Sequence, residues 1–213
     1  MEVTYIQGAL PAKVPVPLFS SVLIGTAENR GTHFNIYLGL DAPKITKLQT
    51  YSLDTTDVDL QANTSDFKRF GEGSYDEWYS KGRVPFALTD RDSGALAALV
   101  WFGPKPLGRK SLKHLSEEEL LREKTVESDD WHTIVFRSYL PYRGTGIMKE
   151  FVRVTTDVYL HYFPDAKLWA GINRANPGSL ALAAKLGYTI NESLSDPTWV
   201  AMIKNSRLTV DGN

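Results

Sequence analysis

Two glycines between a predicted strand and a predicted helix are the feature that most limits how this chain can fold. The sequence at 131–140 is typical of a strand, that at 141–146 of a Gly-rich turn, and that from 147 to about 162 of a helix. Gly144 and Gly146 leave backbone N–H groups uncovered at the helix N-terminus, where the helix dipole favours an anion. This order predicts a phosphate-binding site, although the spacing alone is equally compatible with a tight turn that binds no ligand.

The best-known phosphate-binding motifs do not account for this turn. A Walker P-loop requires Gly-Lys-Ser/Thr, which does not follow Gly146. The dinucleotide fingerprint fails because its third glycine is absent, and because residues 153–157 continue a helix where that fingerprint needs a second strand. The sequence therefore predicts an anion site of another kind.

Short apolar or alternating runs bounded by glycine and proline predict the remaining strands. These strands are expected at 22–25, 34–40, 84–88, 95–102, 167–172 and 198–203. Helical spacing and helix-end signals predict helices at 66–70, 75–79, 116–123 and 178–186. The resulting order of strands and helices predicts a mixed sheet with helices on its faces.

The composition excludes several classes of site. With 213 residues, the chain is long enough for one domain with a continuous core and a complete enzyme. Cysteine is absent, which excludes disulfides, a thiolate nucleophile and Cys-ligated zinc or iron–sulfur sites. The histidines and aspartates are too scattered in the sequence to predict a metal site, so we expect none.

Charge and hydropathy give no reason to expect a nucleic acid or a membrane as partner. The 24 Lys and Arg residues nearly balance the 25 Asp and Glu residues, for a net charge of -1. No stretch approaches the roughly 18 consecutive apolar residues of a membrane span, and residues 1–10 lack the pattern of a secretory signal. We therefore expect a cytoplasmic protein whose anion site is local.

Two segments, Pro141–Ile147 and Ile172–Tyr188, carry a resemblance to a known family. The first is similar to a signature Arg/Gln-x-x-Gly-x-Gly/Ala, with Arg143 at its first position, and the second to a strand, Asn, helix and Gly-Phe/Tyr segment. Both patterns resemble those of the GNAT superfamily of acyl-CoA-dependent N-acetyltransferases, with the close match covering residues 131–188. The resemblance implies an α+β fold, in which a central mixed, mostly antiparallel sheet has helices on both faces and a splayed pair of parallel strands.

The expected domain organisation follows from this match. Residues 1–213 form a single GNAT-like domain, and residues 131–203 are its acyl-CoA-binding core. Residues 1–80 match no motif of the family, so the structure of this N-terminal region is left open.

The resemblance implies that acetyl-CoA or coenzyme A binds as the acyl-donor cosubstrate. The backbone of the glycine turn would cradle its pyrophosphate, and the strand edge at 136–140 would pair with the pantetheine arm. A backbone N–H at 138–140 would polarise the acyl carbonyl, so that the amine attacks directly without a covalent enzyme intermediate. The residues implied in binding are Ser138, Tyr139, Leu140, Arg143, Gly144, Thr145, Gly146, Ile147, Met148, Asn176 and Ser179.

Departures from the family pattern leave the acid–base groups open. Met148 stands where the signature ends in Gly or Ala, and Ala183 stands where many members carry a tyrosine that acts as general acid. The strand from 131 to 139 has no carboxylate for a water-assisted base. The candidate catalytic residues are therefore His132, Tyr139 and Ser179, whose alternative roles are strand packing, core packing and helix capping, respectively.

An aromatic segment falls where the family places its acceptor-lining helices. Phe67, Phe70, Tyr75, Trp78 and Tyr79 recur at helical spacing and can form an apolar or cation-binding wall. The default interpretation of the same residues is core packing.

The leading function hypothesis is an N-acetyltransferase that moves an acetyl group from acetyl-CoA to a primary amine. The acceptor is open between a small molecule and a peptide end. The first alternative is an acyl-CoA-binding sensor or interaction domain without turnover, and the second is a phosphate binder unrelated to coenzyme A. The resemblance also implies that the chain can form a homodimer through the strand near 198–203.

Overall fold

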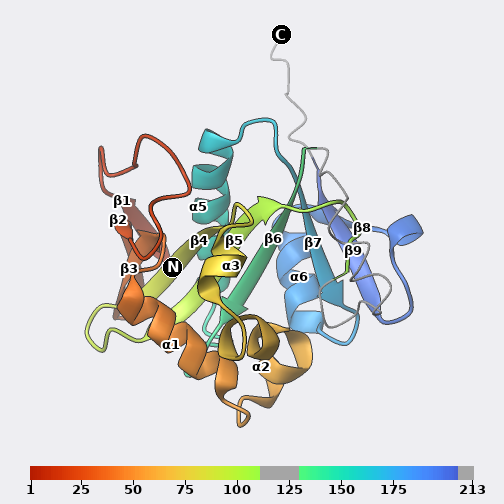
Figure 1. Ribbon diagram of the computed structural model, residues 1–213, viewed down its shortest axis with the longest axis horizontal. Helices are drawn as coiled ribbons and strands as arrows, with labels where there is room; N and C mark the ends of the chain where they lie inside the picture. The colour runs from red at the N-terminus through yellow and green to blue at the C-terminus, as the bar shows by residue number, and fades with distance from the viewer. Residues whose placement is uncertain (111–129, 206–213) are drawn as a thin grey trace.

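One sheet of nine strands runs through the computed structural model, which describes residues 1–110 and 130–205 (Figure 1). The strands are β1 (Glu2–Tyr5), β2 (Val22–Asn29), β3 (Thr32–Leu38), β4 (Val84–Asp90), β5 (Leu96–Pro104), β6 (Trp131–Ser138), β7 (Lys167–Asn173), β8 (Tyr188–Asn191) and β9 (Trp199–Lys204). They lie in the order β1-β2-β3-β4-β5-β6-β7-β9-β8, and β6 with β7 is the one parallel pair among them. This confirms the predicted mixed, mostly antiparallel sheet.

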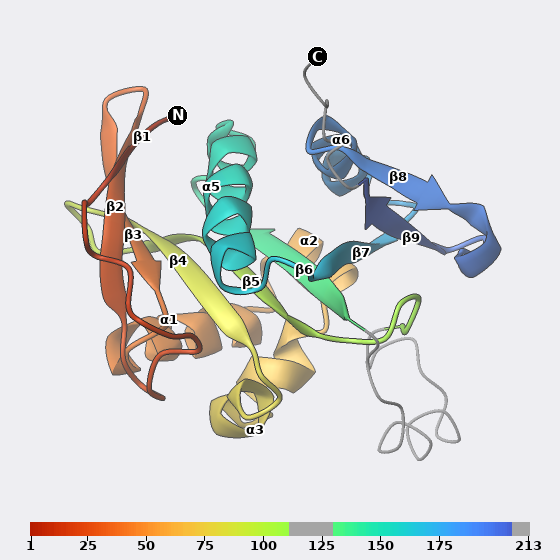
Figure 2. The ribbon, with the colours of Figure 1, turned by 90° about the horizontal axis from the view of Figure 1, so that it is seen from above.

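Helices cover both faces of the sheet, as predicted. The helices are α1 (Ala42–Leu53), α2 (Val58–Asn63), the π-helical turn η1 (Phe67–Gly71), α3 (Tyr75–Tyr79), α5 (Ile147–Tyr162), α6 (Pro177–Lys185) and the 3-10 turn η4 (Glu192–Leu194). Figure 2 shows α5 and α6 on one face and α1, α2 and α3 on the other. The helix predicted at 116–123 lies outside the described residues.

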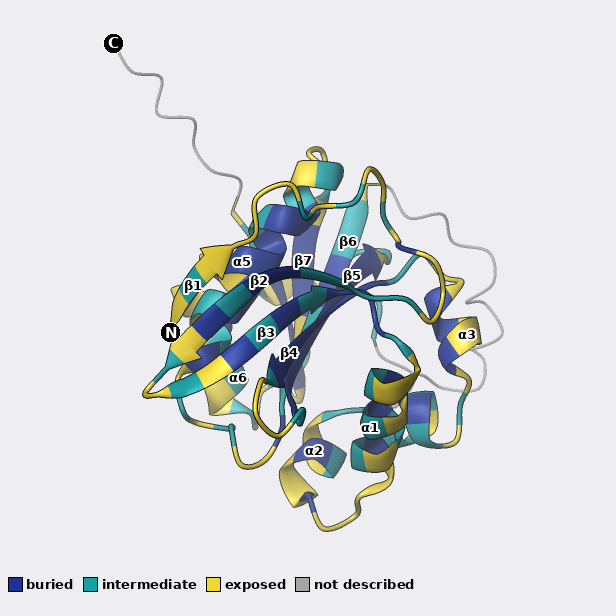
Figure 3. Cartoon of the chain, turned by 90° about the vertical axis from the view of Figure 1, so that its left-hand side faces the viewer, coloured by how far each residue is buried: buried dark blue, intermediate teal, exposed yellow. Residues whose placement is uncertain are grey.

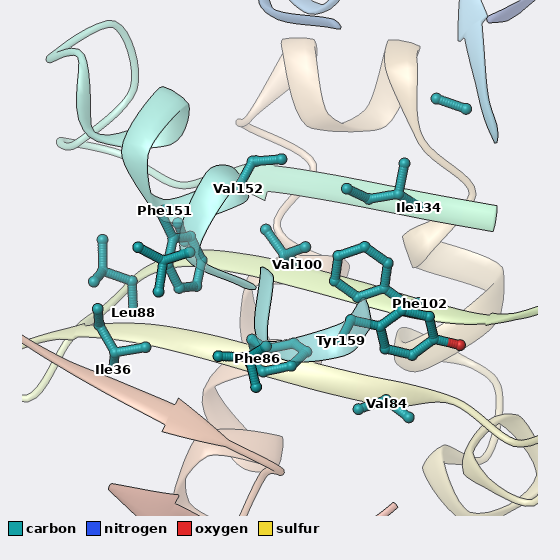
Figure 4. Close-up of a cluster of buried hydrophobic side chains, with 14 of the residues drawn as sticks. Ile36, Val84, Phe86, Leu88, Val100, Phe102, Ile134, Phe151, Val152 and Tyr159 are labelled. Carbon is teal, nitrogen blue, oxygen red and sulfur yellow. The ribbon is translucent and has the colours of Figure 1, made fainter. Parts of the chain in front are cut away.

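The central strands are buried because helices cover both of their faces. Every residue of β5 except the terminal Pro104 is buried, so its sequence is continuously apolar, as expected of a strand with two covered faces. Under α5, the Phe102 ring stacks on Tyr159 with ring centroids 4.4 Å apart, and Phe86 meets Phe102 edge to face (Figure 4). Figure 3 shows β4 and β5 buried, whereas α1 and α2 carry exposed residues on their outer sides.

The N-terminal region holds elements that the sequence analysis did not predict. Helix α1 begins after Asp41, whose carboxylate accepts a hydrogen bond from the Lys44 N–H, and α2 begins after Asp57, which caps the Leu60 N–H in the same way. Two strands were also missed, β1 in this region and β8 after α6. Both are short and lie at the two edges of the sheet.

The strand predicted at 198–203 is confirmed as β9, but it lies inside the sheet. It pairs antiparallel with β7 on one side and with β8 on the other, so β8 forms this edge of the sheet. The predicted homodimer stays a prediction, and one formed by strand addition at this end would use β8. Among the described residues, no helix is both long enough and apolar enough to cross a membrane.

Candidate functional site

The parallel strands β6 and β7 separate after a short paired stretch and leave a gap in the sheet. Their register covers only Trp131–Thr133 against Lys167–Trp169. On the other side of β6, the Tyr139 N–H donates to the Ala97 carbonyl, so the odd-numbered residues of β6 pair with β5. Because antiparallel pairing alternates along a strand, the N–H and C=O groups of Phe136 and Ser138 face the gap.

The opposite wall of the gap is built in the same way. Beyond the end of β7, the Arg174 N–H donates to the Thr198 carbonyl of the β9 side. By the same alternation, the backbone groups of Gly171 and Asn173 face the gap. The ring of Trp199 fills the space next to Gly171, since a Cβ built there would lie 2.4 Å from that ring. The gap is therefore lined by unpaired backbone from two strands.

A cavity of about 790 Å³ occupies this gap and extends between the N-terminal ends of α5 and α6. This volume is within the range of about 300–1,000 Å³ that is usual for small-molecule sites. Tyr139, Leu140 and Thr145, three of the predicted binding residues, are not among its lining residues. The predicted binding residues that do line it are Ser138, Arg143, Gly144, Gly146, Ile147, Met148, Asn176 and Ser179.

The N-terminus of α5 opens into this cavity without a capping side chain. Gly146 is the N-cap residue, with φ of 90°, whereas side chains cap each of the other described α-helices. Gly144 has φ of +78°, and a Cβ built on either glycine would meet no heavy atom within 4 Å. Both glycines therefore hold a left-handed backbone beside open space, and the first N–H groups of a 16-residue helix are available to an anion.

Contacts from other elements hold the glycine turn in place. The Tyr142 hydroxyl donates to Asp90 at 2.9 Å, and the Asn29 side chain donates to the Thr145 carbonyl at 3.3 Å. Within the turn, the Thr145 hydroxyl donates to the Tyr142 carbonyl at 2.6 Å. These bonds join the turn to β2 and β4, so the turn is preorganised by the sheet.

The Arg143 side chain does not point at the glycine turn. Its guanidinium donates to the Asp57 carboxylate at 2.6 and 2.8 Å, to Asp59 at 3.4 Å and to the Ser138 carbonyl at 3.2 and 3.3 Å. The hydrogen bond from Arg143 holds the pKa of Asp57 below its usual value. Arg143 thus fixes the start of α2 against the end of β6, and its charge is compensated by two carboxylates.

Ser179 is the one predicted catalytic residue that lines the large cavity. The prediction that its hydroxyl begins the helix is wrong, because Asn176 is the N-cap residue of α6. The Asn176 side-chain oxygen accepts a hydrogen bond from the Ser179 N–H at 3.0 Å. The Ser179 hydroxyl is therefore not needed for capping, while the side-chain oxygen of Asn176 is already engaged.

The structure places His132 and Tyr139 outside the cavity. His132 lies on the α5 face of the sheet, where its Nδ1 shares a hydrogen bond with the Tyr159 hydroxyl, and burial lowers its pKa. Tyr139 is 2% exposed and packs against Tyr51, and burial raises its pKa. Their catalytic roles stay predictions. The structure brings neither residue together with Ser179.

Ala183 is fully buried in the core beneath α6 and does not line the cavity. The α6 residues that do face it include Ser179, Leu182 and Lys185, which recur at a spacing of three. The helix therefore presents one hydroxyl and one ammonium group to the cavity. Met148, the residue at the end of the signature, lines the cavity beside Gly146.

A smaller cavity of about 90 Å³ lies on the α1–α3 face of the same gap. Its walls hold a buried charge cluster that the sequence analysis missed. The Asp66 carboxylate is 1% exposed and accepts hydrogen bonds from Arg69 at 2.6 Å and from Arg137 at 2.8 and 3.4 Å. Burial alone would raise the pKa of Asp66, but the guanidinium groups of Arg137 and Arg69 lower it.

Lys105 is the third cation at the smaller cavity. Its ammonium lies 5.2 Å from the centroid of the Trp169 ring. Burial, together with the positive charges of Arg69, Arg83 and Arg109, lowers the pKa of Lys105 to about 7. Within the described residues, no group of three or more metal-ligating side chains is found.

Four of the five residues of the aromatic segment confirm the core-packing interpretation, and the fifth, Phe67, is half-buried and is not part of this core. Phe70, Tyr75, Trp78 and Tyr79 are buried together in the core on the α1–α3 face. The cations beside this core belong to the protein itself, since Arg69 and Arg137 lie 5.5 and 5.1 Å from the Trp101 ring centroid. The aromatic residues thus support the charged wall of the smaller cavity from behind.

Solved structures share the arrangement of strands and helices described above. The GNAT domain of S. lividans PAT is 15% identical, with a TM-score of 0.55 over 84% of this chain and 95% of that chain. An acetyltransferase from Agrobacterium tumefaciens str. C58 is 14% identical, with a TM-score of 0.56 over 93% and 100%. A spermidine N-acetyltransferase from Vibrio cholerae, in complex with CoA and spermine, is 12% identical, with a TM-score of 0.54 over 79% and 95%.

These likenesses show that the chain has the GNAT fold, which confirms the fold implied by its sequence. At these identities, the likeness is one of fold. No protein-family model matches the sequence, and no curated protein matches it either.

Proposed function

We propose that this chain is an N-acetyltransferase that moves an acetyl group from acetyl-CoA to a primary amine. The observation that carries the proposal is the uncapped N-terminus of α5, where Gly144 and Gly146 open into a cavity that continues into the β6–β7 gap. The phosphate groups of acetyl-CoA suit the N-terminus of α5, and its narrow, amide-containing pantetheine arm suits the β6–β7 gap. The Vibrio cholerae neighbour, in complex with CoA and spermine, supports the pairing of coenzyme A with an amine.

The residues present fit coenzyme A at each end of the cavity. The N–H groups that follow Gly146 would bind the pyrophosphate, and the ammonium groups of Lys149 and Lys185 line the same cavity. The backbone of Phe136 and Asn173 would pair with the amide groups of the pantetheine arm, as an added strand does with a free sheet edge. Nothing in this assignment needs the Arg143 side chain, which is already paired.

The chain's own groups can then stabilise direct attack by the amine. The Ser138 N–H faces the gap and would donate to the acyl oxygen as negative charge develops on it. The nitrogen–carbon bond forms as the carbon–sulfur bond breaks, and the electron pair of that bond stays on sulfur. The amine nitrogen loses one proton in this step and the sulfur gains one. We propose the Ser179 hydroxyl as the relay that delivers its proton to the sulfur and takes up the proton that the nitrogen releases, since it lines the cavity and does not cap α6.

Calorimetric titration with acetyl-CoA and coenzyme A tests the first step, and a thiol-release screen over amines tests the second. Binding that adenosine 3',5'-bisphosphate displaces, followed by amine-dependent thiol release, is the expected result. Absence of binding would contradict the proposal. A bound phosphate compound that coenzyme A does not displace would favour the unrelated phosphate binder.

A second candidate is an acyl-CoA-binding sensor without turnover. It is favoured by Ala183, which is buried in the core at the position where many family members carry a tyrosine. Tight acetyl-CoA binding without thiol release across amines of differing charge would favour this candidate. Thiol release that depends on the Ser179 hydroxyl would exclude it.

A further inference from the structure

We infer that the acceptor amine carries a carboxylate, which binds in the smaller cavity against Arg69, Arg137 and Lys105. The inference rests on the proposed function and names the substrate class of the same site. It concerns the side of the gap opposite to α5 and α6, where the cavity walls come from the segment after α2, from β6 and from the end of β5.

The cluster has more positive charge than its own carboxylate compensates. Asp66 is the only carboxylate among the described residues that pairs with Arg69 and Arg137, and it serves both. In Arg69, Nη1 is the only guanidinium nitrogen for which the described residues provide a hydrogen-bond acceptor. Lys105 meets the Trp169 ring and has no carboxylate partner among the residues described. Partly buried cations in this state favour an anion that completes their hydrogen bonds.

A buried hydroxyl independently indicates a polar ligand. The Ser65 side chain lines the smaller cavity, and the residue is 7% exposed. Its hydroxyl has no hydrogen-bond partner within the described residues. Buried hydroxyl groups are normally satisfied, so this one points to a ligand that supplies a donor or an acceptor.

The position of the smaller cavity places the anion close to the reacting amine. Val135, Arg137, Gly171 and Asn173 line both cavities, so the anion site adjoins the gap where the acyl group would lie. A volume of about 90 Å³ holds one small group rather than a long chain. The acceptor is therefore a short molecule in which amine and carboxylate are a few bonds apart, as in an amino acid.

The cluster favours a carboxylate over a phosphate. The Asp66 carboxylate already compensates one of the two guanidinium groups, so a monoanion balances the Arg69–Arg137–Asp66 group and a dianion exceeds that balance. We therefore assign the smaller cavity to a carboxylate, and we make a phosphate-bearing amine one of the outcomes of the test.

Matched acceptors test the inference on the full chain. Glycine, β-alanine and 4-aminobutyrate are each compared with the corresponding amide, first by calorimetry on protein saturated with coenzyme A and then by thiol release from acetyl-CoA. The expected result is an advantage of about 10- to 100-fold in affinity and in kcat/KM for the carboxylate member of at least one pair. Equal values for both members of every pair would overturn the inference. So would a preference for phosphoethanolamine over all the carboxylates.

Variants locate the effect. Arg69→Gln and Lys105→Gln are each expected to lower kcat/KM for the preferred carboxylate about tenfold and to leave its amide within about twofold. Lys68→Gln is the matched control, because Lys68 is the exposed neighbour of Arg69 in the same turn and lines neither cavity. If Arg69→Gln fails to fold, Lys105→Gln and Ser65→Ala still decide the matter, since neither breaks an ion pair with Asp66.

The same experiment separates the two proposals. Failure of coenzyme A to bind overturns the proposed function, and the acceptor assignment with it. Binding of coenzyme A with no discrimination between carboxylate and amide overturns only the inference. A carboxylate advantage that survives both the Arg69 and the Lys105 substitutions would place the anion elsewhere and would also overturn it.

Discussion

Gly146→Ala separates the backbone role of the glycine turn from its proposed role in binding. Gly146 and Gly187 form a matched pair, with φ of +90° and +84°, and a Cβ on either residue would meet no atom within 4 Å. Gly187 follows α6 and does not line the large cavity, whereas Gly146 does. An alanine at either position therefore has the same backbone strain, but only one of the two new methyl groups lies in the cavity.

The expected magnitudes differ between stability and binding. Holding alanine in the left-handed region costs about 1–2 kcal/mol, so both variants should lose that much unfolding free energy in urea. The methyl group at Gly146 would also displace an anion from the N-terminus of α5. Loss of one charge-assisted hydrogen bond there, worth about 1.5–3 kcal/mol, predicts roughly 10- to 100-fold weaker coenzyme A binding. Gly187→Ala should bind within about twofold of the unsubstituted protein.

Urea unfolding and calorimetric titration with coenzyme A, on the same preparations of both variants, provide the test. Unchanged affinity in both Gly146→Ala and Gly187→Ala would refute the reasoning, because the open space at Gly146 would then have no ligand to accommodate. Equal losses of affinity in both variants would refute it too, since strain alone would then account for the change.

Three further predictions follow from the charged and buried groups. Asp57→Asn should lower the unfolding free energy by about 1–3 kcal/mol through loss of the Arg143 pair. The pKa of Asp57 is held below 3.8, so the extra unfolding free energy that the aspartate provides over asparagine is present above pH 3.8 and is lost as pH falls through the lowered pKa. Urea unfolding of both proteins at pH 7 and pH 3 measures this difference. The pKa of Lys105 is about 7, so its ammonium group loses its charge between pH 6 and pH 8.5. The calorimetric affinity for a carboxylate ligand such as N-acetylglycine should therefore fall about three- to tenfold over this range, and the pH dependence should vanish in Lys105→Gln. His132→Gln should change kcat less than about threefold because His132 contacts Tyr159 outside both cavities, and a loss of tenfold or more would restore it as a catalytic residue.

The α5 segment could be predicted closely because its signals are local. Gly146 marks the beginning of the helix and Pro164 follows its end, and the structure has α5 at Ile147–Tyr162, within the predicted bounds. Helix α1 was missed although Asp41 precedes a first turn that contains Pro43, a start signal of the same kind. The short edge strands offered only four residues each, too few for a clear alternation.

The two halves of the candidate site differed in how far they could be predicted. The anion site beside α5 depends on backbone conformation, and glycine reports that conformation directly in the sequence. The smaller cavity depends on contacts between distant segments, since Asp66 and Arg137 are 71 residues apart. Two signals were available: Arg137 is a charged residue in a predicted strand, and Asp66 and Arg69 have i, i+3 spacing. Neither signal identifies the contact between Asp66 and Arg137 without the fold.

Charge in the sequence was a poor guide to charge at the site, for a reason that bears on the acceptor. Arg143 occupies the signature position and is compensated by Asp57 and Asp59, so it adds little net charge to the large cavity. Arg69 belongs to no motif, yet it lies beside a cavity where it shares one carboxylate, that of Asp66, with Arg137. Interactions between partly buried charges are weakly screened, so these few groups outweigh a net charge of -1 spread over the whole chain. The local excess of positive charge therefore sets the expected preference for a carboxylate-bearing amine over a polycationic one.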